Sequence, residues 1–243
     1  MKNMFFGTLL LAHVIGDFPL QTDAIFRLKT KYPWGVLPHV FICTIMNILA
    51  LYPYWSNKYA WMAVAFLAIV HTVLDRTKLT VTEKIAKDNF FQFLIDQLLH
   101  IFSIWLTAFW LSQMIDPSDY QVVGPLADQQ VIIQLTALIF AAFGGVPIIY
   151  YAKKYVASFK HNEANNGQTA YPSFLKRIPG YFERFLATLC IIWGGWWLFL
   201  AVGAFLPRLL VNWRDENKAL LFANIIIGIA ISMLCGLFVI IMA

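Results

Sequence analysis

Charged side chains are scarce in this sequence. Only 13% of its 243 residues are Asp, Glu, Lys or Arg, whereas 60% are hydrophobic. Soluble globular proteins contain roughly 25% charged and about 45–50% apolar residues, so a soluble domain of this length would have to expose much apolar surface to water. The shortage of charge therefore argues against an ordinary soluble fold and indicates a protein whose solvent is lipid.

Other absences narrow the possible functions. The three cysteines, Cys43, Cys190 and Cys235, lie in apolar runs without a C-x-x-C pair, so we interpret them as small buried hydrophobic residues and expect no disulfide framework. We find no internal repeat, no glycine-rich phosphate loop and no G-x-S-x-G motif. The net charge of +5 does not indicate nucleic-acid binding, because Lys and Arg lie in short segments between apolar runs, as membrane topology requires.

Seven apolar runs approach the length of about 20 residues that a membrane-spanning helix needs. They predict an all-α, polytopic helical bundle, with a single transmembrane domain over residues 1–243 and C-terminal helices at 182–243. The first run is short and contains His13 and Asp17; if it is re-entrant, six spans remain. We expect this run to be uncleaved, because Asp17 interrupts it and no small-residue cleavage site follows. The runs are Met4–Leu20, Gly35–Tyr54, Tyr59–Asp75, Phe90–Met114, Val131–Tyr151, Phe182–Leu206 and Ala219–Met242.

The charges between the runs predict an orientation. Segments 21–34, 76–89 and 152–181 are rich in Lys and Arg, whereas segment 115–130 contains Asp but neither Lys nor Arg. The positive-inside rule places the three basic segments, including a cytoplasmic loop at 152–181, inside the cell and the acidic one outside. With seven spans, the N-terminus is then outside and the C-terminus cytoplasmic.

Histidine and aspartate recur in these runs at a spacing of four residues, which places both side chains on one helix face. Ionisable groups inside a membrane cost at least about 2.5–3.5 kcal/mol each, so they persist where they pair or function. A further histidine, His39, stands alone near the start of the second run. With the predicted orientation, all seven side chains reach the same cytoplasmic-side depth, in a motif-bearing four-helix half at residues 1–114. The three pairs are His13 and Asp17, His71 and Asp75, and Asp96 and His100.

Imidazole and carboxylate groups together are typical ligands of zinc, manganese and iron. We therefore predict a site for a divalent metal, preferably zinc, formed by these seven residues, with Gln21 and Gln97 next to the ligands. A proton relay or plain hydrogen bonding between helices would use the same pattern. Candidate catalytic residues are Lys78 and Arg184, which would stabilise negative charge, and Glu183, which would transfer a proton. Glu183 and Arg184 could instead form an interfacial ion pair.

Three motifs carry a resemblance to a bacterial family of small membrane proteins, classified as a domain of unknown function, over about residues 5–110. The pattern H-x-x-G-D-F-x-x-Q begins at His13, H-x-x-x-D-x-x-K begins at His71, and D-Q-x-x-H begins at Asp96. The acidic residue expected in the last span of such proteins is missing, although Gly228 and Ser232 match that motif. The resemblance implies a helical inner-membrane protein, and its His/Asp pattern is distantly similar to predicted membrane-bound metal-dependent hydrolases.

These observations predict a membrane-embedded metal-dependent hydrolase that acts on a lipid or lipid-linked (phospho)ester at the cytoplasmic leaflet. The metal would activate water and polarise the ester. One alternative is a metal-ion or proton transporter, although its path would need polar residues toward the outer side, where the later runs have few. Another is a metal-binding structural or regulatory membrane module without catalysis. Membrane lipid is the predicted partner, and the sequence does not indicate an oligomeric state.

Overall fold

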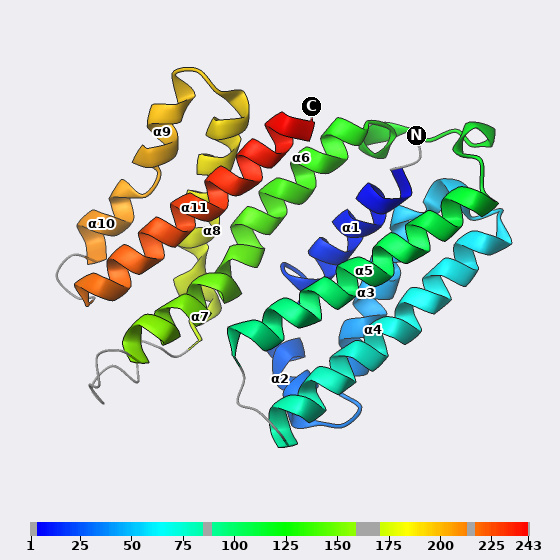
Figure 1. The fold of residues 1–243 in the computed structure, drawn as a ribbon, viewed down its shortest axis with the longest axis horizontal. Helices are drawn as coiled ribbons and strands as arrows, with labels where there is room; N and C mark the ends of the chain where they lie inside the picture. The colour runs from blue at the N-terminus through cyan, green and yellow to red at the C-terminus, as the bar shows by residue number, and fades with distance from the viewer. Residues whose placement is uncertain (1–3, 85–88, 159–170, 213–216, 243) are drawn as a thin grey trace. The chain divides into compact units, whose positions relative to one another are not determined.

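The computed structural model describes residues 4–84, 89–158, 171–212 and 217–242. These residues form helices joined by turns and short 3-10 segments, and no strand occurs among them. The described chain divides into two compact units, residues 1–136 and 137–243, which we describe separately. Figure 1 shows the course of the helices within each unit.

The first unit is built around four helices that pack in a ring. The ring helices are α1 (Met4–Asp17), α3 (Val36–Ala50), α4 (Lys58–Lys84) and α5 (Phe90–Met114). The unit also contains α2 (Asp23–Lys31), the first part of α6 (Gln129–Ile139), and the short 3-10 segments η1 (Tyr52–Tyr54), η2 (Pro117–Asp119) and η3 (Gly124–Ala127). In the ring, α1 and α4 each pack on both α3 and α5, while the short helix α2 packs on α3 (Figure 1). Successive ring helices run in opposite directions, so the end of α1, the start of α3, the end of α4 and the start of α5 meet at one end.

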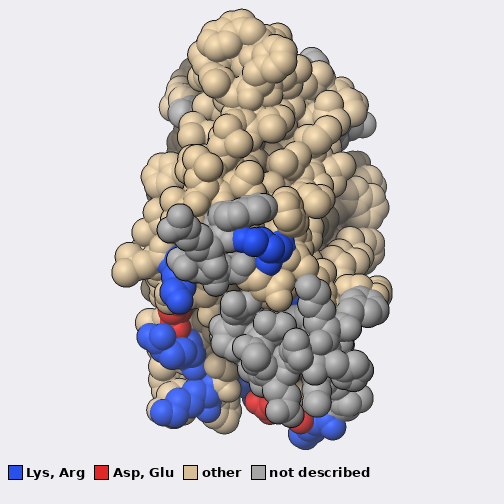
Figure 2. All heavy atoms as spheres, turned by 90° about the vertical axis from the view of Figure 1, so that its left-hand side faces the viewer, with Lys and Arg blue, Asp and Glu red and all other residues tan. Residues whose placement is uncertain are grey.

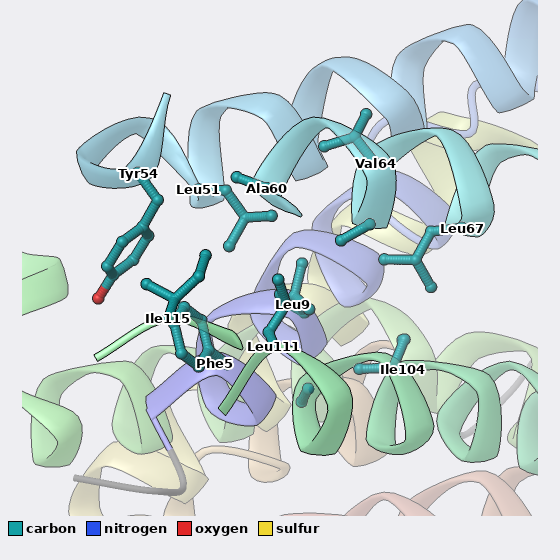
Figure 3. Close-up of a cluster of buried hydrophobic side chains, with 12 residues drawn as sticks. Phe5, Leu9, Leu51, Tyr54, Ala60, Val64, Leu67, Ile104, Leu111 and Ile115 are labelled. Carbon is teal, nitrogen blue, oxygen red and sulfur yellow. The ribbon is translucent and has the colours of Figure 1, made fainter. Parts of the chain in front are cut away.

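An apolar cluster fills the other part of the ring. Its side chains come from α1, α4, α5 and the segment that follows α3, and Figure 3 shows them converging between these helices. Leu9 and Leu111 are completely buried, and Leu67 and Ile104 are nearly so. Close packing of this kind holds helices together where lipid removes the hydrophobic drive for association.

Within the part of the chain that the structure describes, four helices are long and apolar enough to cross a membrane. They are α4, α5, the helical stretch Gln129–Val156, and α11 (Lys218–Met242). On the face shown in Figure 2, uncharged side chains cover most of the surface, and Lys and Arg side chains gather toward one end. This separation of charge is typical of membrane proteins. The predicted all-α class is therefore confirmed, and the described residues include four candidate membrane-spanning helices.

The predicted number of seven spans is not confirmed. With 14 and 15 residues, α1 and α3 extend only about 21 and 22 Å at a rise of 1.5 Å per residue. The hydrocarbon core of a bilayer is about 30 Å thick, so these helices are too short to cross it when straight. The predicted sixth span, Phe182–Leu206, is broken at Gly194 and Gly195, whose φ angles of +68° and +57° are left-handed and end the helix.

Several predicted loops contain helix. The predicted loop 21–34 contains α2, and α4 continues to Lys84, through most of the predicted loop 76–89. The predicted cytoplasmic loop 152–181 begins inside α7 (Gly145–Ser158) and ends inside α8 (Phe174–Trp193). The polar stretch 161–170 at its centre lies outside the described residues.

The second unit is built on α8 and α11. Besides α7 and the end of α6, it contains a π-helical turn, η4 (Phe140–Gly144), and two short helices, α9 (Trp197–Gly203) and α10 (Leu206–Asn212). Helix α8 packs on α11, α9 and η4, and α7 packs on α11. Buried Ala187, Ile191 and Phe205 form its main apolar cluster.

Candidate metal centre

Four of the five histidines in the chain lie together in the first unit, where the ends of the ring helices meet. The rings of His13 and His100 are stacked, with centroids 5.2 Å apart and planes at 17°. The His71 ring lies 4.5 Å from His100 and 5.0 Å from His39, centroid to centroid. All four side chains are buried, and His39 is completely so. The structure thus brings together residues that the sequence separates by up to 87 positions (from 13 to 100).

The polar residues form two successive layers along the ring. We call His13, His71 and His100 the histidine layer, and Asp17, Asp75 and Asp96 the aspartate layer. Each aspartate stands four residues from a histidine on its own helix, one turn toward the end where the ring helices meet. His39 links the layers, since its Nε2 lies 3.2 Å from His71 Nε2 and 3.4 Å from Asp17 Oδ1.

Cys43 belongs to the same cluster, although the sequence analysis treated it as a hydrophobic residue. Its Sγ lies 3.7 Å from Asp17 Oδ1 and 3.8 Å from His39 Nε2. Gly16 makes this possible, because a Cβ there would stand only 2.7 Å from Cys43 Sγ. The overlooked signal was the spacing, since Cys43 follows His39 by four residues and therefore shares its helix face.

Two groups of these side chains lie close enough together to hold a metal ion. Within each group, one ligand atom from each residue lies within 4.8 Å of the others. Their nitrogen, oxygen and sulfur donors are those that zinc uses in proteins. The groups are Asp17, His39, Cys43 and His71, and His71, Asp75 and His100.

The tautomer of His100 can be assigned from its backbone contact. Its Nδ1 lies 2.8 Å from the Asp96 carbonyl oxygen, which can only accept a hydrogen bond, so Nδ1 carries the proton. In the neutral ring, Nε2 then carries the lone pair. Among the described residues, buried Nε2 atoms of both His100 and His13 have no hydrogen-bond partner. A histidine held at one nitrogen by a carbonyl and free at the other is the usual arrangement of a metal ligand.

Two lysines partly neutralise the aspartate layer. Lys29 Nζ lies 2.6 Å from Asp75 Oδ2, and Lys78 Nζ lies 2.9 Å from Asp96 Oδ2. Burial by itself lowers the pKa of Lys29, but the carboxylates of Asp75 and Asp17 more than offset this effect, and the pKa is raised. With neutral histidines, three carboxylates face two ammonium groups, so the cluster retains one negative charge. Lys29 was absent from the predicted site, because its segment was interpreted as a loop.

The two predicted neighbours of the ligands, Gln21 and Gln97, also reach the cluster. Gln97 Nε2 lies 3.2 Å from Asp96 Oδ2 and 3.5 Å from Asp17 Oδ2. Gln21 Nε2 lies 3.4 Å from His39 Nε2. Because both amides contact residues that bear candidate ligand atoms, they are placed to orient them.

Residues 5–123 match the family described as "Protein of unknown function (DUF3307)". We call residues 5–123 the DUF3307 segment. The predicted resemblance to a domain of unknown function is thereby confirmed, and the DUF3307 segment includes every residue of the two layers. Neither the curated proteins nor the solved structures contain a match to the chain. The expected likeness to metal-dependent hydrolases thus finds no support in these comparisons.

The cluster in the DUF3307 segment approaches the surface at its aspartate layer, which we call its open side. At the aspartate layer, the Lys78 side chain is 25% exposed. On the other side, each residue of the histidine layer is followed one turn further by a buried aliphatic residue of the apolar cluster shown in Figure 3. These residues are Leu9 next to His13, Leu67 next to His71, and Ile104 next to His100.

The other two predicted catalytic residues, Glu183 and Arg184, lie outside the DUF3307 segment, in the second unit. Both side chains are buried in α8. Glu183 accepts hydrogen bonds from Arg208 Nε, at 2.7 Å to Oε2, while Arg184 donates to the backbone carbonyls of Ala141 and Ala142. Their predicted catalytic roles stay predictions.

Proposed function

We propose that the DUF3307 segment binds a divalent metal ion, preferably zinc, within the His/Asp/Cys cluster. We further propose that the segment hydrolyses a lipid or lipid-linked (phospho)ester at the cytoplasmic leaflet. The observation that carries the proposal is the pair of buried, unpartnered Nε2 atoms of His13 and His100, beside a set of donors within 4.8 Å of one another. Ring nitrogens without a partner are costly to bury unless something binds them.

A bound metal would supply an activated water and polarise the ester oxygen. The residues of the chain have separate tasks in this proposal. A carboxylate of the aspartate layer that does not bind the metal would accept the proton released from the water. Lys78, which lies between Asp96 and the partly exposed edge of the cluster, stabilises negative charge on the substrate.

The surroundings of the open side favour a lipid substrate. Helix α5 begins there, and its first turns expose large apolar side chains, among them Phe91, Ile95 and Leu98. Such side chains contact acyl chains when the helix lies in a membrane. A substrate with a polar headgroup and an acyl tail would therefore place its headgroup at the aspartate layer and its tail along α5.

The apolar cluster argues against the alternative of a metal-ion or proton transporter. A transport path must continue across the membrane, and it is usually lined by ionisable groups and water. Here the polar layers end at Leu9, Leu67 and Ile104, all buried. Binding and chemistry at one side of the membrane fit this arrangement better than conduction.

Metal analysis of purified protein tests the proposal. We expect about one zinc per chain in wild-type protein prepared without chelator, and less than about a tenth of that in His100→Ala. The matched control is His161→Ala, since His161 is the one histidine outside the DUF3307 segment. Equal metal content in the two variants, or none in the wild type, would contradict the metal site.

Hydrolysis is tested separately on the metal-loaded protein. We expect turnover of at least one phospholipid or lipid-linked phosphate in mixed micelles, and loss of turnover on addition of chelator and in Lys78→Met. Loaded protein that turns over no lipid, yet carries zinc into sealed vesicles, would favour transport. Metal binding with neither activity would favour a structural module.

A further inference from the structure

A buried arginine and a half-buried arginine converge beside a glycine in the second unit. A Cβ at Gly180 would stand 2.9 Å from Nη1 of Arg184 and 3.0 Å from Nη2 of Arg208. Arg184 is on the same helix as Gly180, α8, while Arg208 comes from α10. Arg184 is only 2% exposed, and the Arg208 side chain is 11% exposed. The absence of a side chain at Gly180 therefore lets N–H donors of two guanidinium groups converge beside its backbone.

The position of Arg184 is fixed by the π-helical turn η4. Its guanidinium group donates to the carbonyls of Ala141, at 2.7 Å, and Ala142. A π-helical turn shifts backbone hydrogen bonding from its α-helical pattern and so leaves carbonyls that need other donors. Gly145 leaves room for the side chain, because a Cβ there would lie 2.6 Å from Arg184 Nε. These contacts occupy Nε and Nη2 and leave Nη1 directed toward Gly180.

The charges of this group do not balance. Glu183 pairs with Arg208 through both carboxylate oxygens, at 3.0 and 2.7 Å from Arg208 Nε. It is the one acidic residue in the part of the second unit that the structure describes. Arg184 is held by carbonyl dipoles, which bring no net charge. Among the described residues of the second unit, two guanidinium groups thus share one carboxylate, and a surplus charge with little access to water is unfavourable without a counter-ion.

We propose that Arg184 and Arg208 bind a phosphate group beside Gly180. Phosphate oxygens match the planar donor geometry of guanidinium groups, and a second anion would balance the surplus charge. The phosphate belongs either to a lipid headgroup or to a free anion. This site uses only residues of the second unit and does not depend on the proposed metal-dependent hydrolysis.

Binding is measured by calorimetry on the full-length protein in neutral detergent, with inorganic phosphate and with dihexanoyl phosphatidic acid as probes. Chelator is present throughout, because a metal ion in the first unit would itself bind phosphate. We expect Gly180→Ala to weaken binding at least tenfold, since its methyl group displaces both guanidinium groups. Gly203→Ala is the matched control, because a Cβ at Gly203 would meet open space beyond its own stretch of helix. It should bind like the wild type.

A second variant should change the affinity for the probes in the opposite direction. Glu183→Gln removes the carboxylate that competes for Arg208, so we expect several-fold tighter binding of the same probes. A purely structural ion pair would give no such gain. Arg208→Gln should abolish binding of both probes. If circular dichroism shows that this variant does not fold, the Glu183→Gln measurement still tests the phosphate site.

The two probes distinguish the sources of the phosphate. Tight binding of phosphatidic acid with weak binding of inorganic phosphate identifies a lipid headgroup site, and equal binding identifies a site for the free anion. The proposal is overturned if neither probe binds, if Gly180→Ala and Gly203→Ala bind alike, or if Glu183→Gln binds no more tightly than the wild type.

Discussion

Replacing Lys29 by Met tests how the aspartate layer is held in the fold. The change removes the ammonium group 2.6 Å from Asp75 Oδ2 but keeps most of the side-chain volume. Asp75 is 2% exposed, so its carboxylate would stay buried without its cation. Removing one partner of a buried ion pair costs about 3–5 kcal/mol, because the other charge is left uncompensated.

This cost translates into a large shift of the melting temperature. For a chain of 150–250 residues, 1 kcal/mol corresponds to about 2–4 °C, so Lys29→Met should melt about 6–20 °C lower than the wild type. Lys31→Met is the matched control on the same helix. Lys31 is exposed, and a surface substitution usually changes stability by less than about 0.5 kcal/mol. Both melts are followed by circular dichroism in detergent with chelator.

A double variant and added zinc identify the cause. Lys29→Met with Asp75→Asn should recover part of the lost stability, because it removes the uncompensated carboxylate. Zinc should stabilise Lys29→Met more than the wild type, since the metal charge would replace the ammonium group beside Asp75. The reasoning is refuted if Lys29→Met and Lys31→Met melt within about 2 °C of each other, or if the double variant recovers nothing.

Three further predictions concern other parts of the chain. Cobalt-loaded wild-type protein should show a thiolate-to-metal charge-transfer band that Cys43→Ser lacks; a band that persists would exclude Cys43 as a ligand. Gly35→Ala should lower the unfolding free energy by about 1–3 kcal/mol, because its Cβ would overlap the backbone carbonyl of Leu28; an unchanged melt would contradict the packing of α2 on α3. Reporter fusions at Gly124 and Gly167 should report opposite sides of the membrane, since one candidate span, the stretch Gln129–Val156, separates them; a shared side would remove the support for the predicted orientation.

The meeting of the histidines and aspartates could be predicted because two local rules determine it. A spacing of four residues fixes which side chains share a helix face, whatever the tertiary structure. Alternating basic and acidic loops then predict which helix ends lie together. His13, His71 and His100 follow both rules and are in contact. Cys43 obeys the first rule equally well, but its residue type led to a different interpretation.

The features that sequence reasoning missed depend on tertiary packing or on backbone angles. Helix α2 has only nine residues, and its one buried residue is Lys29. A buried lysine runs against the pattern by which amphipathic helices are recognised, because that pattern expects apolar residues on the buried face. Likewise, hydropathy averages composition, so the apolar run around Gly194 and Gly195 predicts one span, whereas their left-handed backbone ends the helix.

The order of the layers along the ring bears on what the cluster can do. The imidazoles lie next to the apolar cluster, and a neutral imidazole costs less free energy to bury than a charged group. The carboxylates lie one turn nearer the exposed edge, where Lys29 and Lys78 pair with them. An ion that enters at Lys78 would meet the carboxylates first, then the unpartnered nitrogens of His13 and His100, and would then be stopped by buried leucine and isoleucine. A path that ends at its best ligands retains the ion there. In our proposal, this arrangement suits a metal that stays bound, whereas a conducting pore would need polar groups beyond the histidine layer.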